Sequence, residues 1–213
     1  MKLINRPFFP DEIRLLNKLK LKYSQKAVSR LKVYDLLLIF ITGIAFADMA
    51  TMIKSGMGVA VFGTLAGLCF FVVLFAPFER YQNNRRIKRK WSAANSLLMQ
   101  NGLTVTRVNA LQIALAAEYE DEGDLYLVAY KQDAVLYLWD NNYQLSKRLP
   151  CLNFDIYPEE FTRLTGHQVY TLSEQIMPLS IAAAHKWKYL KKYGSPRQLS
   201  TEEITMEDLI ARF

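Results

Sequence analysis

Apolar residues are concentrated in one stretch of the chain, residues 36–78. Positions 58–78 contain no charged residue, and positions 36–53 contain only one, Asp48. A helix needs about 20 apolar residues to cross the hydrocarbon core of a bilayer. Residues 34–53 and 58–78 are therefore predicted to be two transmembrane helices, joined by a short polar turn. We interpret Asp48 as an interfacial residue near the end of the first span.

Amphipathic patterns flank this hairpin on both sides. In residues 1–33, apolar positions recur every three or four residues between lysines and arginines, which predicts a basic amphipathic helix that begins after Pro10. Two interpretations stay open: the helix lies on the inner leaflet, or its apolar stripe packs on the soluble domain. Residues 79–102 are predicted to continue the second span as a juxtamembrane helix.

From residue 103 the hydrophobic period shortens to two, which predicts strands. Residues 125–130 and 134–139 are rich in aromatic and branched side chains and form a predicted hairpin, with 143–149 as a third strand. Residues 110–117 fit either a helix or a strand. The remaining predicted elements are strands at 150–157 and 166–172, a turn or short helix at 158–160, and helices at 178–193 and 201–212, the last with a capping box at Ser200 and Glu203.

Residues 103–213 are thus predicted to form one cytoplasmic domain with a small antiparallel β-sheet and flanking helices. Both faces of that sheet are apolar, so helices or another sheet should cover them. The predicted fold class is an α+β membrane protein, with a two-helix transmembrane hairpin attached to this domain.

Basic residues give the hairpin an orientation. Nine lysines and arginines occur in residues 1–35 and six in residues 79–90, but the connecting turn has only Lys54. Because basic residues stay on the cytoplasmic side, both termini should be cytoplasmic and the protein a multi-pass protein of the cell inner membrane. The side chains expected at the membrane interface follow the second span: Arg85, Arg86, Lys88, Arg89, Lys90 and Trp91.

The net charge of +7 would suit a nucleic-acid-binding protein, but its distribution does not. Residues 91–184 carry five basic and eleven acidic side chains, so the predicted soluble core is acidic. We therefore expect anionic lipid headgroups, rather than nucleic acid, to meet the basic segments.

Small residues in the second span suggest a helix–helix contact. Gly63 and Gly67 form a G-x-x-x-G pattern, which lets helix backbones approach closely in lipid. We favour packing on the first span of the same hairpin; the alternative is a homo-oligomer or another membrane protein. Cys69 lies in this span and Cys151 in the soluble domain, so the two should not form a disulfide.

Few residues carry recognisable catalytic chemistry. Neither histidine has a second ligand at metal-binding spacing, and no phosphate-binding or nucleophile motif occurs, so no metal or cofactor is expected. Cys151 and His167 are the candidates for a catalytic dyad. An acidic loop could bind a divalent cation or a partner through its carboxylates, Glu118, Glu120, Asp121, Glu122 and Asp124.

These features favour a non-enzymatic function. The hypothesis is a membrane-anchored interaction or regulatory module that holds or modulates a protein partner at the inner face of the membrane. The alternative is a membrane-embedded hydrolase or transferase that acts on lipid-linked substrates through Cys151, His167 or the acidic loop. A channel or transporter subunit is disfavoured, because two spans offer only Asp48 as a polar lining group.

Overall fold

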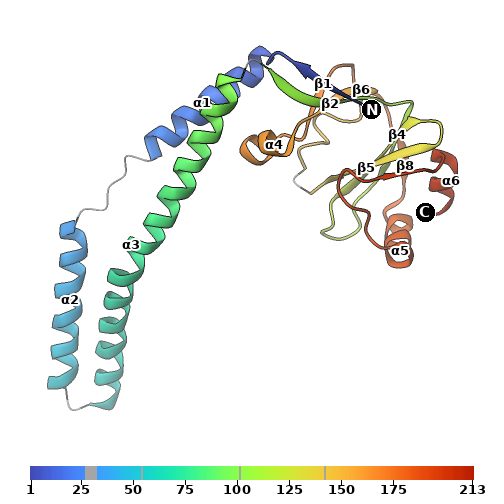
Figure 1. Ribbon diagram of the computed structural model, residues 1–213. Helices are drawn as coiled ribbons and strands as arrows, with labels where there is room; N and C mark the ends of the chain where they lie inside the picture. The colour runs from blue at the N-terminus through green and yellow to red at the C-terminus, as the bar shows by residue number, and fades with distance from the viewer. Residues whose placement is uncertain (27–32, 54, 101, 142) are drawn as a thin grey trace. The chain divides into compact units, whose positions relative to one another are not determined.

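The computed structural model describes residues 1–26, 33–53, 55–100, 102–141 and 143–213. Within these ranges it has six helices and nine strands, and the strands form two sheets, so the architecture is α+β. The chain divides into two compact units (Figure 1). Residues 11–99 make up the helical unit, and residues 1–10 with 100–213 make up the sheet unit.

The helical unit contains α1 (Pro10–Lys26), α2 (Val33–Met52) and α3 (Gly56–Met99). As predicted, α3 continues far beyond its apolar segment. Helix α1 lies along this second part of α3 (Figure 1). Leu16 of α1 and Ala94 of α3 are fully buried, and Nζ of Lys90 lies 5.9 Å from the ring centre of Tyr23. Part of α1 therefore lies on α3, an arrangement that neither interpretation from the sequence included.

Helices α2 and α3 pack side by side and approach closely at Gly43 (Figure 1). A Cβ atom added at Gly43 would lie 3.0 Å from Cβ of Cys69. At Gly63 and Gly67, an added Cβ would meet no neighbouring atom of the described chain within 4 Å. Neither glycine is therefore a point of close approach to the described part of α2, which was the favoured interpretation; docking of this face to a second copy or to another membrane protein stays a prediction.

Leucine substitutions distinguish the two glycine faces. We expect Gly43→Leu to destabilise the α2–α3 pair by about 1–3 kcal/mol, because overpacking displaces the neighbouring side chain or backbone. Gly67→Leu adds the same side chain to α3 in open space and should leave stability unchanged. Thermal unfolding of both variants in one detergent measures the difference. Equal losses would mean that Gly43 is not the close contact.

The sheet unit contains one four-stranded and one five-stranded sheet. The first is antiparallel, in the order β1 (Lys2–Arg6), β2 (Leu103–Asn109), β6 (Asn153–Ile156) and β7 (Val169–Thr171). The second has the order β8 (Leu179–Ile181), β3 (Gln112–Ala116), β4 (Asp124–Lys131), β5 (Ala134–Asp140) and β9 (Thr201–Glu202). Within it, β8 runs parallel to β3, and the other pairs are antiparallel.

Both faces of the five-stranded sheet are covered, as predicted. One face shares a core with the four-stranded sheet, in which Val128 and Leu136 pack with Phe154. On the other face, side chains of β5 pack with Tyr189 of α5 (Ala183–Tyr193) and Leu209 of α6 (Met206–Ala211). Strand β5 is consequently buried at every position.

The predicted antiparallel meander is present, but its strands differ from the expectation. Residues 110–117, whose sequence fits either a helix or a strand, contain β3, which pairs with β4. Residues 143–149 form turns instead of the predicted third strand. The carboxylate of Asp140 explains the turns, because it accepts hydrogen bonds from the backbone N–H of Gln144 at 2.8 Å and of Ser146 at 2.9 Å.

Two C-terminal details are also corrected. The segment predicted as a helix from residue 178 begins with β8, and α5 starts only at Ala183. The predicted capping box at Ser200 is absent, because the following residues pair with β5 as β9. The N-cap of α6 is Thr205, whose Oγ1 accepts from the backbone N–H of Asp208 at 3.1 Å.

Strand β1 was not anticipated. It pairs with β2 from Lys2 opposite Arg107 to Arg6 opposite Leu103. The helical unit is therefore inserted between two adjacent strands of one sheet, and the chain leaves and re-enters the sheet unit at neighbouring positions.

Candidate functional site

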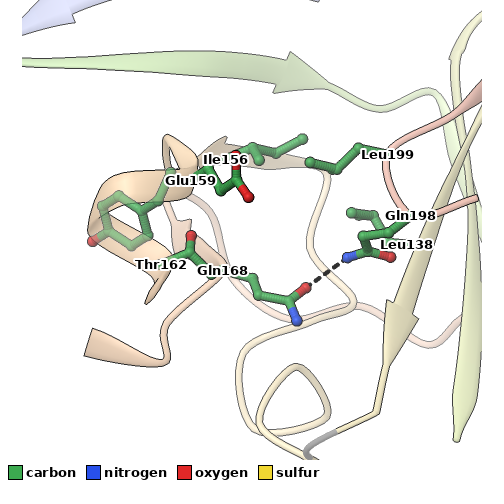
Figure 2. Close-up of a pocket in the computed structure, with 8 residues that line it drawn as sticks. Leu138, Ile156, Glu159, Thr162, Gln168, Gln198 and Leu199 are labelled. Atoms are coloured by element: carbon green, nitrogen blue, oxygen red, sulfur yellow. Dashed lines mark hydrogen bonds between the residues drawn. The ribbon is translucent and has the colours of Figure 1, made fainter. Parts of the chain in front are cut away.

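A pocket of about 370 Å³ opens in the sheet unit (Figure 2). Ligand pockets in proteins commonly measure about 300–1,000 Å³, so this one could hold a small molecule. Its lining comes from β5, from the end of β6 and the residue after it, from α4 (Glu159–Thr165), from the residue before β7 and from the segment before β9. The lining residues are Leu138, Ile156, Tyr157, Glu159, Thr162, Gln168, Gln198 and Leu199.

Helix α4 brings two polar side chains to the pocket. Glu159 and Thr162 are three residues apart, so they share one face of the helix. Extended Pro158 and two glutamates in the first turn favour the helix start, and Gly166 ends the helix with a φ of 79°. These local signals place a carboxylate and a hydroxyl beside the aliphatic side chains of the sheets.

Gln198 fixes another wall of the pocket. Its Oε1 accepts a hydrogen bond from the backbone N–H of Trp139 at 2.6 Å, and its Nε2 donates to Oε1 of Gln168 at 2.8 Å (Figure 2). The next residue, Leu199, has a φ of 61°, a left-handed conformation that is unfavourable for a leucine. Its backbone N–H donates to the carbonyl of Tyr137, which holds this segment along β5.

The lining of the pocket is largely apolar with a few polar groups. Its lining combines aliphatic side chains with one carboxylate, two carboxamides and the hydroxyls of Tyr157 and Thr162, and Glu159 is the only charged residue among the described residues that line it. The Glu159 carboxylate also pairs with Arg163 one turn later, where both side chains are well exposed. The lining includes neither cysteine nor histidine, so no nucleophile–base pair is formed from these residues.

Cys151 and His167 acquire no catalytic features. The Cys151 thiol is buried and donates to the carbonyl of Asn153 at 3.5 Å. Burial raises the pKa of Cys151 to about 11, whereas a reactive cysteine has a lowered pKa. Burial, together with the charge of Arg148, lowers the pKa of His167, and its Nδ1 has no hydrogen-bond partner among the described residues. The dyad therefore gains no support.

The acidic loop is folded back on itself by its own carboxylates. Glu122 accepts hydrogen bonds from the backbone N–H groups of Tyr119 at 2.9 Å and Glu120 at 2.8 Å. Asp124 accepts from the backbone N–H of Glu118 at 2.9 Å. Within the described residues, no group of three or more His, Cys, Asp or Glu side chains is placed to hold a metal ion.

A buried lysine fixes this loop to α5. Lys186 has no exposed surface; its Nζ lies 2.9 Å from Oε1 of Glu122 and donates to the carbonyl of Gly123 at 2.7 Å. Burial opposes ionisation of Glu122, but its hydrogen bonds from Lys186 and the backbone outweigh this effect and lower its pKa to about 2. Next to this contact, Tyr119 of the loop stacks on Trp187, with ring centres 5.6 Å apart.

The basic side chains between residues 85 and 90 of α3 are exposed. None of them forms an ion pair within the described residues; Arg85 lies over the ring of Tyr81 and Lys90 over that of Tyr23. The set consists of Arg85, Arg86, Lys88, Arg89 and Lys90, and Trp91 follows it with a partly exposed ring.

Sequence reasoning missed the pocket and Lys186. The pocket residues come from segments that are far apart in the sequence, and only the one-turn spacing of Glu159 and Thr162 was visible. Lys186 lies among basic residues that look equally exposed, so no local signal distinguishes it. No protein-family model, curated protein or solved structure matches the chain.

Proposed function

We propose that this protein is a membrane-anchored module whose sheet unit holds or modulates a protein partner at the inner face of the membrane. The observation that carries the proposal is the uncovered apolar surface of α2 and α3. Each of these helices contains a strongly apolar segment of 18 residues, and only 6% of that segment is buried within the chain. Soluble proteins rarely leave such a surface in water, whereas lipid covers it favourably.

Charge supports the orientation. Residues 11–99 carry 14 basic and five acidic side chains, whereas the rest of the chain carries 13 basic and 15 acidic ones. The basic set from Arg85 to Lys90 is exposed and is not neutralised by ion pairs among the described residues, so it is free to meet anionic headgroups. Placing it on the cytoplasmic side puts both termini there as well.

The surface around the Tyr119–Trp187 stack is the part of the sheet unit that we assign to the protein partner. Lys186 holds the acidic loop rigidly beside α5, and Nζ of Lys191 lies 4.9 Å from the ring centre of Trp187. Aromatic side chains fixed in this way bind a partner without a large loss of conformational entropy, and they are enriched in protein interfaces.

Membrane anchoring is tested by placing charge in the apolar part of α3. The full chain should stay in the membrane pellet after an alkaline carbonate wash and need detergent for release. Leu68→Arg with Val72→Arg should move a large fraction to the supernatant, because each arginine near the bilayer centre costs about 2.5–3.5 kcal/mol by insertion scales. Met99→Arg, on the same helix and 76% exposed, is the matched control and should remain in the pellet.

A C-terminal reporter tests the orientation. A reporter that works only in the cytoplasm should be active, and a reporter that works only outside the cell should be inactive. A wild-type chain that stays in the supernatant without detergent, or a reporter that is active only outside the cell, would contradict the proposed function.

A further inference from the structure

We propose that the pocket of Figure 2 binds a small aliphatic amine in its protonated form. This ligand site goes beyond the proposed membrane anchoring and does not depend on it, because every lining residue belongs to the sheet unit.

The aliphatic part of the pocket would receive the carbon chain of the ligand. Leu138 and Ile156 are buried side chains that form a fixed floor, whereas Leu199 is 46% exposed in the structure. Because the main chain at Leu199 is tied to β5, its side chain already lies beside the pocket before a ligand arrives. Such preorganisation favours binding, since little conformational entropy remains to be lost.

The charge of the lining favours a positively charged ligand. Glu159 contributes a carboxylate, and neither lysine, arginine nor histidine lines the pocket. An anion would therefore face the like charge of Glu159, and Arg163, the ion-pair partner of Glu159, is not among the described lining residues. The ion pair between Glu159 and Arg163 is exposed, so it contributes little energy. A bound cation would share the carboxylate of Glu159 with Arg163.

The polar groups also match the shape of an ammonium group. A primary ammonium has three N–H donors and no acceptor. The lining includes three kinds of acceptor, the carboxylate of Glu159, the hydroxyl of Thr162 and the carbonyl of Gln168, whose carboxamide reaches toward Gln198 (Figure 2). Gln168 Oε1 already accepts from Gln198 but keeps a second lone pair. An alkylammonium would donate hydrogen bonds to these acceptors while its chain lies on the aliphatic floor.

Three probes of equal chain length test the proposal: n-butylammonium, n-butanol and butyrate. The full chain is placed in nanodiscs of zwitterionic phosphatidylcholine, with empty nanodiscs as the partition control. Methyl NMR of isoleucine and leucine then reports binding at Ile156 and Leu199. Butylammonium should shift these methyl signals saturably and bind about two- to fivefold more tightly than butanol, as an ion pair with an exposed carboxylate predicts. Butyrate should cause no saturable shift.

A matched pair of variants identifies the carboxylate. Glu159→Gln should weaken butylammonium binding about two- to fivefold and leave butanol binding unchanged. Glu160→Gln changes the adjacent acid in the same first turn of α4, which does not line the pocket, and should have no effect. Equal affinities for the three probes, or unchanged amine binding in Glu159→Gln, would overturn the proposal. Neither outcome would alter fractionation with the membrane.

Discussion

Asp155→Ala is expected to lower the free energy of unfolding of the sheet unit by about 3–5 kcal/mol, the range for breaking a buried ion pair by removing one partner. Asp155 has no exposed surface and joins three strands. Its Oδ2 accepts from Nε of Arg6 in β1 at 2.8 Å, and its Oδ1 accepts from Nε of Arg107 in β2 at 2.8 Å. The substitution leaves the largely buried Arg6 without this carboxylate.

The loss should be greatest at the N-terminal strand. Arg6 also lies over the ring of Phe9, 3.9 Å from its centre, and Phe9 stacks on Tyr170. Hydrogen exchange of the full chain in detergent measures the effect: backbone amides of β1 and β2 should exchange faster in Asp155→Ala. Asp133→Ala removes an exposed acid from the turn between β4 and β5 and serves as the control. The same exchange rates in both variants would contradict a stabilising role for the cluster.

The cluster also predicts a direction for the pH dependence. Burial opposes ionisation of Asp155, but the hydrogen bonds and charges of Arg107 and Arg6 outweigh it and lower its pKa. A carboxyl whose pKa is lower in the folded state stabilises the fold above its unfolded pKa, near 3.9. That contribution is lost as the pH falls through the folded-state pKa. Wild-type protein should therefore lose more stability on acidification below about pH 4 than Asp155→Ala does.

Local patterns predicted the long helices and the central strands well. Residues 34–53 and 58–78 correspond to α2 and the first part of α3, and 125–130 and 134–139 to β4 and β5. In each case the hydrophobic period or run length is a property of the segment itself, so it can be read without knowledge of the neighbours.

Features that depend on distant partners were missed. β1 is only five residues long and is defined by its pairing with β2, on the other side of the helical unit in sequence. Residues 143–149 have strand-like composition, but the single carboxylate of Asp140 holds their backbone in turns. The pocket likewise brings together Glu159 of α4 and Gln198 of the segment before β9, which are far apart in the sequence. Tertiary contacts decide all three, and propensity does not encode them.

Lys186→Met is expected to lower the free energy of unfolding by about 3 kcal/mol. This is the lower end of the range for breaking a buried pair, because the Glu122 side chain keeps 19% of its surface exposed and retains its backbone donors. Methionine fills a similar volume, so the loss reports the missing ammonium rather than a cavity. Lys188→Met, two residues along α5 and exposed, should change stability by less than about 0.5 kcal/mol.

The pH dependence separates the ion pair from simple packing. The pKa of Glu122 is lowered to about 2 in the folded protein, against 4.5 for a free glutamate side chain. Its contribution is thus complete above about pH 4.5 and is lost as the pH falls toward 2. Denaturant titrations of the full chain should show Lys186→Met and wild type converging in stability as the pH is lowered through this window. A double variant with Glu122→Gln should lose less than the sum of the single losses, because the two side chains act on each other. Two outcomes would contradict the ion pair: stability losses of the single variants that add exactly in the double variant, or a difference between Lys186→Met and wild type that does not change with pH. Either would mean that α5 is attached by packing alone and that the acidic loop does not depend on Lys186 for its place beside Trp187.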